Sequence, residues 1–452
     1  EILMANDIRG IVGKTHTPEI GRAVGQALGS LARERQQTAI AVGRDGRLAG
    51  PELAGALMQG IVSAGVDAID VGCVPTPLTY FAAYHLDCHS CVSVTGSHNP
   101  PDYNGLKMVI GGETLALDAI QQLKARIETG NLLSGTGSMR STDVREAYIA
   151  KILGDIKLAR PMKIVMDCGN GVAGGIAPQV FKALGCSPVE LFCDVDGTFP
   201  NHHPDPSKPE NLQDVVRALK ETDAELGLAF DGDGDRLGVV TKNGEIIFPD
   251  RQLMLFAADV LSRVPGGEII YDVKCTRLLA PFIREHGGKP TMWQTGHALI
   301  KKKLKETGAP LAGEMSGHVF FKERWYGFDD ALYTGARLLE ILSRSADPSA
   351  VLKALPNAAS TPELNIKMAE GEPFALLDEL KASARFTEAQ EIITIDGLRV
   401  EYADGFGLAR PSNTTPVVVL RFEADNPAAL ARIQDDFRRV LHAARPGLPL
   451  PF

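Results

Sequence analysis

The spacing of apolar and polar positions divides most of the chain into a repeated unit. Each unit has a short apolar strand, a polar loop, a helix that ends at glycine and a second strand. The three copies occupy residues 38–47, 51–65 and 66–72; residues 163–169, 176–185 and 188–192; and residues 268–274, 275–287 and 290–293. Strands that alternate with helices of this length form βαβ units, so we expect mixed or mainly parallel sheets.

The last hundred residues have a different pattern. Residues 361–368 and 416–422 are predicted strands, and residues 374–384 form a predicted helix. Asp396-Gly397 is a typical hairpin turn between strands at residues 392–395 and 398–402. A final helix begins near Pro427, and its apolar stripe consists of Leu430, Ile433, Phe437, Val440 and Leu441. This order predicts a separate α+β domain.

The predicted fold class is therefore α/β, with three similar mixed-sheet domains followed by a C-terminal α+β domain. The stretches near residues 135–147, 244–250 and 345–360 are the expected boundaries. They divide the chain into domains at residues 1–144, 145–245, 246–357 and 358–452.

Composition narrows the classes of function. A net charge of −9 over 452 residues disfavours nucleic acid as a partner, because the long-range field repels phosphate backbones. The chain contains no uninterrupted run of about 18 apolar residues, so the sequence predicts no membrane span. The first residues do not resemble a secretory signal. Seven scattered cysteines favour free thiols in a reducing compartment, so we expect a cytoplasmic protein. The lysine run at residues 301–303 is interpreted as a solvated helix face, because apolar residues recur around it at helical spacing.

Asp231-Gly-Asp-Gly-Asp-Arg236 is the sharpest chemical signal in the chain. Three carboxylates within five residues repel one another unless a cation neutralises them, and hard oxygen ligands suit magnesium or calcium. An EF-hand is disfavoured because loop positions six and twelve hold Arg236 and Lys242. Dinucleotide binding is disfavoured because Leu237 stands at the third glycine position. A solvated acidic turn is the remaining alternative to a metal site.

Ser97 lies in a second motif, Thr95-Gly-Ser-His-Asn-Pro-Pro101, which follows an apolar strand and is expected to form an exposed, stiff loop. The serine could instead cap the next segment. A hydrolase triad is disfavoured because the G-x-S-x-G elbow is missing and His98 adjoins the serine in sequence.

Two further polar motifs carry ligand-binding groups. Gly313-Glu-Met-Ser-Gly-His318 presents a carboxylate, a hydroxyl and an imidazole, which can bind sugar hydroxyls. Arg410-Pro-Ser-Asn-Thr-Thr-Pro416 presents a guanidinium, hydroxyls and an amide, which are donors that suit a phosphate dianion. Either motif could alternatively be a simple turn.

Taken together and in this order, the four motifs resemble the α-D-phosphohexomutase superfamily, and within it the bacterial phosphomannomutase/phosphoglucomutase group. The resemblance covers essentially the whole chain. Lesser signatures of the family are Asp7-Ile-Arg-Gly10, Asn104-Gly-Leu-Lys107, Asp272-Val-Lys274, Thr295-Gly-His297 and residues 320–325. The resemblance implies four domains around one central cleft, with one loop from each.

The resemblance also implies a role for each matching residue. Ser97 would be the phosphoserine, and Asp231, Asp233 and Asp235 would hold Mg²⁺ together with its phosphoryl group. The residues expected around the transferring phosphoryl are Arg9, Lys107 and Arg236. Lys107, then His318, would relay the proton. The expected substrate contacts are Asn6, Lys274, His297, Glu314, Ser316, His318, Arg410, Ser412, Asn413 and Thr414. Asn6 stands where the family often has tyrosine, so this contact is expected to differ.

The implied reaction is the reversible interconversion of hexose 1-phosphate and hexose 6-phosphate, for mannose and glucose, through a hexose 1,6-bisphosphate that reorients in the cleft. The nearest rival is phosphoglucosamine mutase, whose members tend to have glutamine where this chain has Met315. A nucleotide-dependent sugar kinase is disfavoured because the chain has no G-x-x-x-x-G-K-[ST] motif. A non-catalytic sensor is disfavoured because Ser97 and the aspartates are retained. We expect small sugar phosphates to be the binding partners, and we expect the protein to be a monomer.

Overall fold

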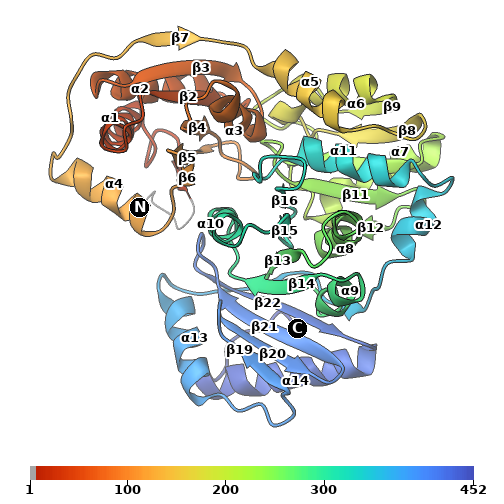
Figure 1. Cartoon of the computed structure of the whole chain (residues 1–452). Helices are drawn as coiled ribbons and strands as arrows, with labels where there is room; N and C mark the ends of the chain where they lie inside the picture. Colours follow the sequence, from red (N-terminus) through yellow and green to blue (C-terminus); the bar gives the residue numbers. More distant parts are fainter. Residues whose placement is uncertain (1–6) are drawn as a thin grey trace.

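The computed structural model describes residues 7–452, which form four β-sheets arranged around the centre of the molecule (Figure 1). The first three sheets are mixed and carry helices, and the fourth is antiparallel throughout. This arrangement confirms the predicted class of three α/β domains and one C-terminal α+β domain.

The first sheet has the order β1-β5-β4-β2-β3-β7, with β6 beside β5. Its parallel strands are β4, β2, β3 and β7, while β1 and β5 run antiparallel to their neighbours. The strands are β1 (Ile8–Ile11), β2 (Ala39–Arg44), β3 (Asp67–Cys73), β4 (Cys91–Val94), β5 (Tyr103–Ile110), β6 (Glu113–Thr114) and β7 (Met139–Ser141). The helices are α1 (Pro18–Glu34), α2 (Gly50–Ser63), α3 (Thr76–His85) and α4 (Asp118–Glu128).

The second sheet has the order β12-β11-β10-β8-β9, and its β10, β8 and β9 are parallel. Its strands are β8 (Met162–Asp167), β9 (Cys186–Leu191), β10 (Leu226–Phe230), β11 (Leu237–Thr241) and β12 (Ile246–Ile247). The helices of this part are α5 (Arg145–Asp155), α6 (Ala177–Leu184) and α7 (Gln213–Glu221), with short 3-10 turns at Val172–Gly175 and Pro209–Leu212. The hairpin between β10 and β11 carries the aspartate motif at the carboxyl end of a buried strand.

The third sheet has the order β14-β13-β15-β16. Its strands are β13 (Glu268–Asp272), β14 (Lys289–Trp293), β15 (Leu311–Gly313) and β16 (Val319–Phe321). The helices of this part are α8 (Pro249–Leu261), α9 (Leu279–Glu285), α10 (His297–Thr307), α11 (Ala331–Leu342) and α12 (Pro348–Lys353). The predicted helix at residues 275–287 is shorter in the structure, because Cys275 and Thr276 form a turn whose amides bond to Asp272 and Asp250.

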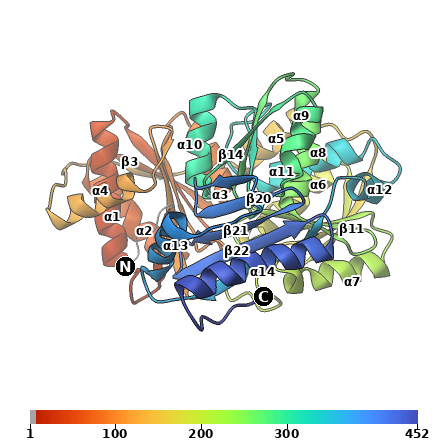
Figure 2. The same ribbon diagram turned by 90° about the horizontal axis from the view of Figure 1, so that it is seen from below.

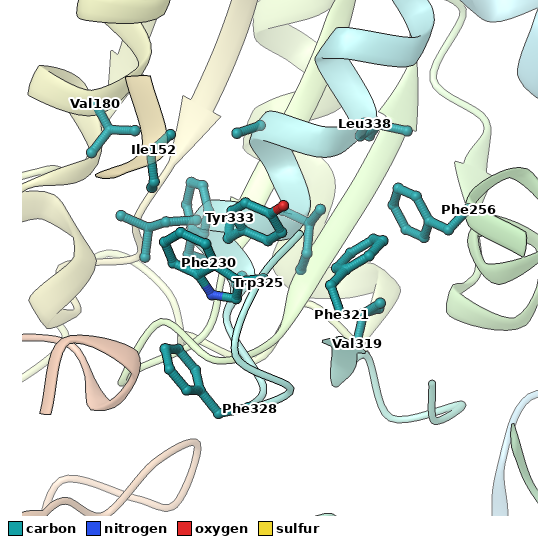
Figure 3. Packing of buried hydrophobic residues seen from close by; sticks show 14 of the residues in the cluster. Ile152, Val180, Phe230, Phe256, Val319, Phe321, Trp325, Phe328, Tyr333 and Leu338 are labelled. Carbon is teal, nitrogen blue, oxygen red and sulfur yellow. The ribbon is translucent and has the colours of Figure 1, made fainter. Parts of the chain in front are cut away.

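Helix α11 belongs to the third part of the chain but packs on the second sheet, beside α6 and β11 (Figure 1). Its Gly335 lies against Phe181 and Leu228, and its N-terminus is capped by Asp330, which accepts from the Tyr333 amide. Tyr333 stacks on Trp325 at 4.1 Å between ring centroids, inside a core to which the first, second and third domains all contribute (Figure 3). The shared core holds these three domains together.

The fourth sheet has the order β17-β22-β21-β20-β19, with β18 also paired to β22. Its strands are β17 (Ala359–Ser360), β18 (Leu364–Lys367), β19 (Glu391–Ile393), β20 (Leu398–Tyr402), β21 (Gly405–Pro411) and β22 (Val417–Ala424). Helices α13 (Glu372–Ser383) and α14 (Pro427–Ala444) cover one face (Figure 2). On the other face, the buried Arg399 donates to the carbonyl oxygens of Val273 and Cys275 and docks the domain on the third.

Strand β21 was not among the strands predicted from the sequence. The glycines leave room for α14 on this strand. A Cβ on Gly407 would lie 2.3 Å from the Phe437 ring, and one on Gly405 would lie 2.7 Å from Ile433. Glycine in this segment therefore marks close helix–sheet packing.

Glycines also set the distance between α1 and α2, which leads to a stability prediction. A Cβ on Gly60 would lie 2.0 Å from the carbonyl oxygen of Arg22. Gly60→Ala must therefore push the two helices apart, and we expect it to lower the free energy of unfolding of the first domain by about 1–3 kcal/mol. Gly55 lies on the same helix with nothing within 4 Å of a Cβ, so Gly55→Ala is the matched control. It should raise stability by about 0.5–1 kcal/mol. Equal shifts in thermal midpoint for the two variants would contradict this account.

Candidate active site

Ser97 lies in the loop between β4 and β5 and is only 2% exposed. Its φ angle of 51° is in the left-handed region, which non-glycine residues rarely adopt and which costs of order 1–3 kcal/mol. Its Oγ lies 3.2 Å from His98 Nδ1. The serine is therefore held in a strained conformation by its surroundings.

The group that holds the serine loop is Arg47, in the loop between β2 and α2. Its two terminal nitrogens donate to four backbone carbonyl oxygens, those of Ser97, Asn99, Pro100 and Tyr103. Asp45 completes the support: it accepts from the Arg47 guanidinium, from the Thr95 hydroxyl at 2.7 Å and from the Gly96 amide at 3.1 Å. Both side chains are buried.

The aspartate loop lies directly against the serine loop. A Cβ on Gly232 would lie 2.1 Å from the carbonyl oxygen of Ser97, so only glycine permits this approach. Backbone hydrogen bonds fix the aspartate loop from both sides. Thr76 in the first domain donates to the Asp233 carbonyl, and Ala331 at the start of α11 donates to the Gly234 carbonyl.

Asp231, Asp233 and Asp235 are fully buried, and one oxygen from each lies within 4.8 Å of the others. Burial and the two neighbouring carboxylates raise the pKa of Asp231 well above its usual value. The Oδ1 atoms of Asp233 and Asp235 are buried and have no hydrogen-bond partner among the described residues. A divalent cation would satisfy these oxygens and offset the repulsion, so the residues present fit a metal ion.

Cations from other loops neutralise part of this charge. Lys107, on β5, donates to Asp233 at 2.8 Å and to Asp235 at 2.6 Å. Burial lowers the pKa of Lys107, but the two carboxylates outweigh it and raise the pKa above the usual value. Arg236 donates to Asp231 at 3.0 Å, and its outer nitrogens contact Asp205 and the Ser316 carbonyl oxygen.

His318 joins the aspartate loop to the loop of the third domain. Its Nε2 lies 3.4 Å from Asp235, and its Nδ1 lies 3.2 Å from Glu314. Burial disfavours the charged ring, but Asp235, Glu314 and Asp329 together raise its pKa to about 10. His318 is therefore an imidazolium near neutral pH. Ser316 also reaches this ring, with its Oγ 3.1 Å from Nδ1.

Two other histidines near the centre of the molecule are neutral. Burial, followed by Arg236, Arg9 and Lys107, lowers the pKa of His98 well below its usual value. Burial also lowers the pKa of His297, whose ring lies 5.7 Å from that of His318. Both ring nitrogens of His297 are buried without a partner among the described residues, so they can still bind a ligand.

The Arg410 motif forms the hairpin tip between β21 and β22. Arg410 Nε donates to Asp396 at 3.0 Å, and the other oxygen of Asp396 accepts from the Thr295 amide at 2.9 Å. Ser412 Oγ accepts from the amides of Thr414 and Thr415, while Asn413 lies at the tip. Within residues 7–452, no hydrogen bond or ion pair joins this motif directly to the Ser97 or aspartate loops.

The remaining predicted residues that the structure describes lie near the serine loop or between the third and fourth domains. Arg9 donates to Asn99 in the serine loop at 2.7 Å and to Asp7. Lys274 is buried and donates to Glu363 of the fourth domain at 3.2 Å. Asn6 lies outside the described residues.

The sequence analysis missed several groups at this site. Asp45 and Arg47 lie in Arg44-Asp-Gly-Arg47, whose position directly after a buried strand was the available signal. The interpretation of residues 301–303 as a solvated helix face is wrong for Lys301. Its side chain is 10% exposed, and its Nζ lies 3.1 Å from the buried Asp329, which in turn lies 3.7 Å from His318.

Family models match each of the four domains of the chain. Four models match in order: phosphoglucomutase/phosphomannomutase alpha/beta/alpha domain I at residues 2–133, domain II at 146–244, domain III at 248–359 and the C-terminal domain at 363–440. The chain belongs to the phosphoglucomutase/phosphomannomutase family. It is thereby a member of the α-D-phosphohexomutase superfamily, as the four motifs indicated.

Relatives within the phosphoglucomutase/phosphomannomutase family align over their full lengths. A phosphomannomutase/phosphoglucomutase of Pseudomonas aeruginosa is 58% identical over 100% of this chain and 97% of its own. A phosphoglucomutase of Neisseria meningitidis is 59% identical over 100% and 98%. A crystal structure of a family protein from Burkholderia thailandensis matches with a TM-score of 0.96 and 64% identity, covering 100% of this chain and 99% of that one. In the part of the chain that the structure describes, no helix is long and apolar enough to cross a membrane.

The support of the serine loop by Arg47 yields a prediction about turnover. Arg47→Lys keeps the charge but cannot span four carbonyl oxygens, so the left-handed Ser97 backbone should relax. We expect kcat to fall by at least about tenfold, because a displacement near 1 Å costs up to about a hundredfold, while KM changes little. Arg44→Lys is the control, since Arg44 is half-buried and its only ion pair within residues 7–452 is with Asp70.

Arg47→Ala should recover part of its turnover when guanidinium is added, which a general loss of stability would not show. Normal turnover of Arg47→Lys would overturn the supporting role.

Proposed function

We propose that this protein is a phosphohexomutase that interconverts hexose 1-phosphate and hexose 6-phosphate, with glucose and mannose as the sugars. The observation that carries the proposal is the contact of Gly232 with Ser97, which places a strained serine against three buried carboxylates. Cationic groups from three domains meet at the same point. The names of the Pseudomonas and Neisseria relatives support both sugars.

The proposed reaction transfers the phosphoryl group twice. Phosphorylated Ser97 gives its phosphoryl to O6 of a hexose 1-phosphate. The proton of the O6 hydroxyl ends on Ser97 Oγ as the bond between Oγ and phosphorus breaks, and a hexose 1,6-bisphosphate forms. The bisphosphate reorients in the cleft, and the Ser97 hydroxyl attacks its O1 phosphoryl group, with the hydroxyl proton passing to the departing O1. Hexose 6-phosphate is released and phosphorylated Ser97 is restored.

The expected metal is Mg²⁺, held by Asp231, Asp233, Asp235 and the Ser97 phosphoryl oxygens. When bound, it supplies positive charge at the transferring phosphoryl group. Arg9, Lys107 and Arg236 supply further charge from the protein itself, which matters because phosphoryl transfer depends mainly on positioning and charge neutralisation. Lys107 and His318 are both cationic in this arrangement, so each can donate a proton to the departing oxygen and regain one from the attacking hydroxyl. We assign the proton relay to Lys107 first and to His318 second.

Recognition of the sugar is assigned to the third and fourth domains. We assign the binding of sugar hydroxyl groups to Glu314 and Ser316, with the unpartnered ring nitrogens of His297 and the buried ammonium group of Lys274 as further contacts. Arg410, Ser412, Asn413 and Thr414 are proposed to bind the phosphate group that does not react. Atoms O3 and O4 exchange places when the sugar reorients, so contacts to them can form in both orientations. These contacts do not depend on the configuration at C2, where glucose and mannose differ, and would therefore accept both sugars.

Ser97→Ala tests the phosphoserine directly. Loss of the phosphoryl carrier should lower turnover of glucose 1-phosphate and mannose 1-phosphate by at least about a hundredfold. After incubation with glucose 1,6-bisphosphate, the intact mass of the unaltered protein should show one phosphate that Ser97→Ala lacks. Ser141→Ala, at an exposed serine on β7, should retain both properties. Near-normal turnover of Ser97→Ala would refute the proposal.

Metal removal tests the aspartate loop. Because the three carboxylates are buried together, EDTA should abolish activity and Mg²⁺ should restore it. Asp233→Asn removes one of the three negative charges and leaves a neutral amide beside Lys107 and the unpartnered Oδ1 of Asp235. The affinity for Mg²⁺, measured by calorimetry, should therefore fall at least about tenfold, while the protein stays folded. Asp223→Asn, at an exposed carboxylate, should bind Mg²⁺ normally. Full activity in metal-free buffer would contradict the assignment.

A further inference from the structure

A cavity of about 460 Å³ lies between the first and third domains, away from the serine loop. It reaches Cys91 at the start of β4 and Val109 near the end of β5, which face each other in the sheet. Ser97 follows the opposite end of β4. The cavity is therefore separate from the active site, and its volume is in the range of small-molecule pockets.

Aromatic side chains from both domains form its walls. Tyr80 and Tyr84 come from α3, while Tyr326 and Phe328 come from the loop after β16. Tyr326 and Phe328 are stacked with an interplanar angle of 5°, and the Tyr84 ring lies 4.7 Å from that of Tyr326. These surfaces suit a flat apolar group.

The rim of the cavity is cationic. Lys301, Lys302 and Lys305 from α10 and Lys322 from the third domain line it. Glu113 lies opposite, but Arg35 already pairs with it at 3.1 Å. Within residues 7–452, no carboxylate forms an ion pair with Lys302, Lys305 or Lys322. A positive cavity with unpaired ammonium groups, on a chain of net charge −9, is complementary to an anion.

We propose that this cavity is a binding site for a small organic anion with a flat apolar body, such as an aromatic carboxylate, sulfonate or phosphate. The apolar body packs against the aromatic wall formed by Tyr80, Tyr84, Tyr326 and Phe328, and the charged group meets Lys302, Lys305 and Lys322. Such a ligand bridges the first and third domains. It also contacts Lys301, whose ammonium group neutralises Asp329 beside His318. The proposal does not depend on the mutase activity.

The test uses 8-anilinonaphthalene-1-sulfonate as the probe and its fluorescence as the measurement, on the full chain. We expect saturable binding at one site, weakened at high salt. Lys305→Glu should raise the dissociation constant about tenfold or more, because it places a negative charge at the sulfonate. Tyr84→Ala should also weaken binding, through the lost aromatic surface.

Lys303→Glu is the matched control, since it makes the same charge change on the same helix. Lys303 lies over the Trp293 ring at 4.1 Å and does not line the cavity, so binding should be unchanged. Equal binding by Lys305→Glu and Lys303→Glu would overturn the proposal. Displacement of the probe by glucose 1,6-bisphosphate would place it in the active site and would also overturn it.

Discussion

The structure depends on the neutralisation of three buried carboxylates at one point between three domains. Asp231, Asp233 and Asp235 have no access to water, and removing one partner from a buried ion pair costs about 3–5 kcal/mol. Lys107 comes from the first domain, Arg236 from the second and His318 from the third. The charges of Lys107 and His318 therefore join the first and third domains to the aspartate loop of the second.

This electrostatic requirement explains the unusual backbone around the serine. The aspartate loop can approach only because Gly232 has no side chain, and the Ser97 backbone beside it is in the left-handed conformation. Arg47 binds the carbonyl oxygens of Ser97 and Asn99, and Asp45 compensates the charge of Arg47. The strain at Ser97 is thus balanced by buried hydrogen bonds in the first domain.

The fold class and the four motif loops could be predicted because each rests on a local pattern. The aspartate loop is a hairpin between two buried strands, and all three of its carboxylates lie within six consecutive residues. Groups that act on residues far away in the sequence had no such pattern. Arg47 resembles any arginine after a strand, Lys301 resembles a surface lysine on an amphipathic helix, and only the tertiary structure brings them to Ser97 and Asp329. Strand β21 was missed because its glycines serve the packing of α14, which sequence spacing does not show.

The fourth domain is connected to the carboxylates by a continuous series of polar contacts. Arg410 bonds to Asp396, and Asp396 accepts from the Thr295 amide. The next amide, that of Gly296, donates to Glu314 at 2.8 Å, and Glu314 contacts His318 beside Asp235. Each link in this series is an acidic side chain held by a donor from another loop. A phosphate bound by Arg410 would compete with Asp396 for the guanidinium group. A sugar hydroxyl that donates a hydrogen bond to Glu314 would add to the donors that this carboxylate already has. In the proposed binding mode, the two ends of a sugar phosphate would act on one hydrogen-bonded series, which would relate the position of the distant phosphate to the charge around the aspartate loop.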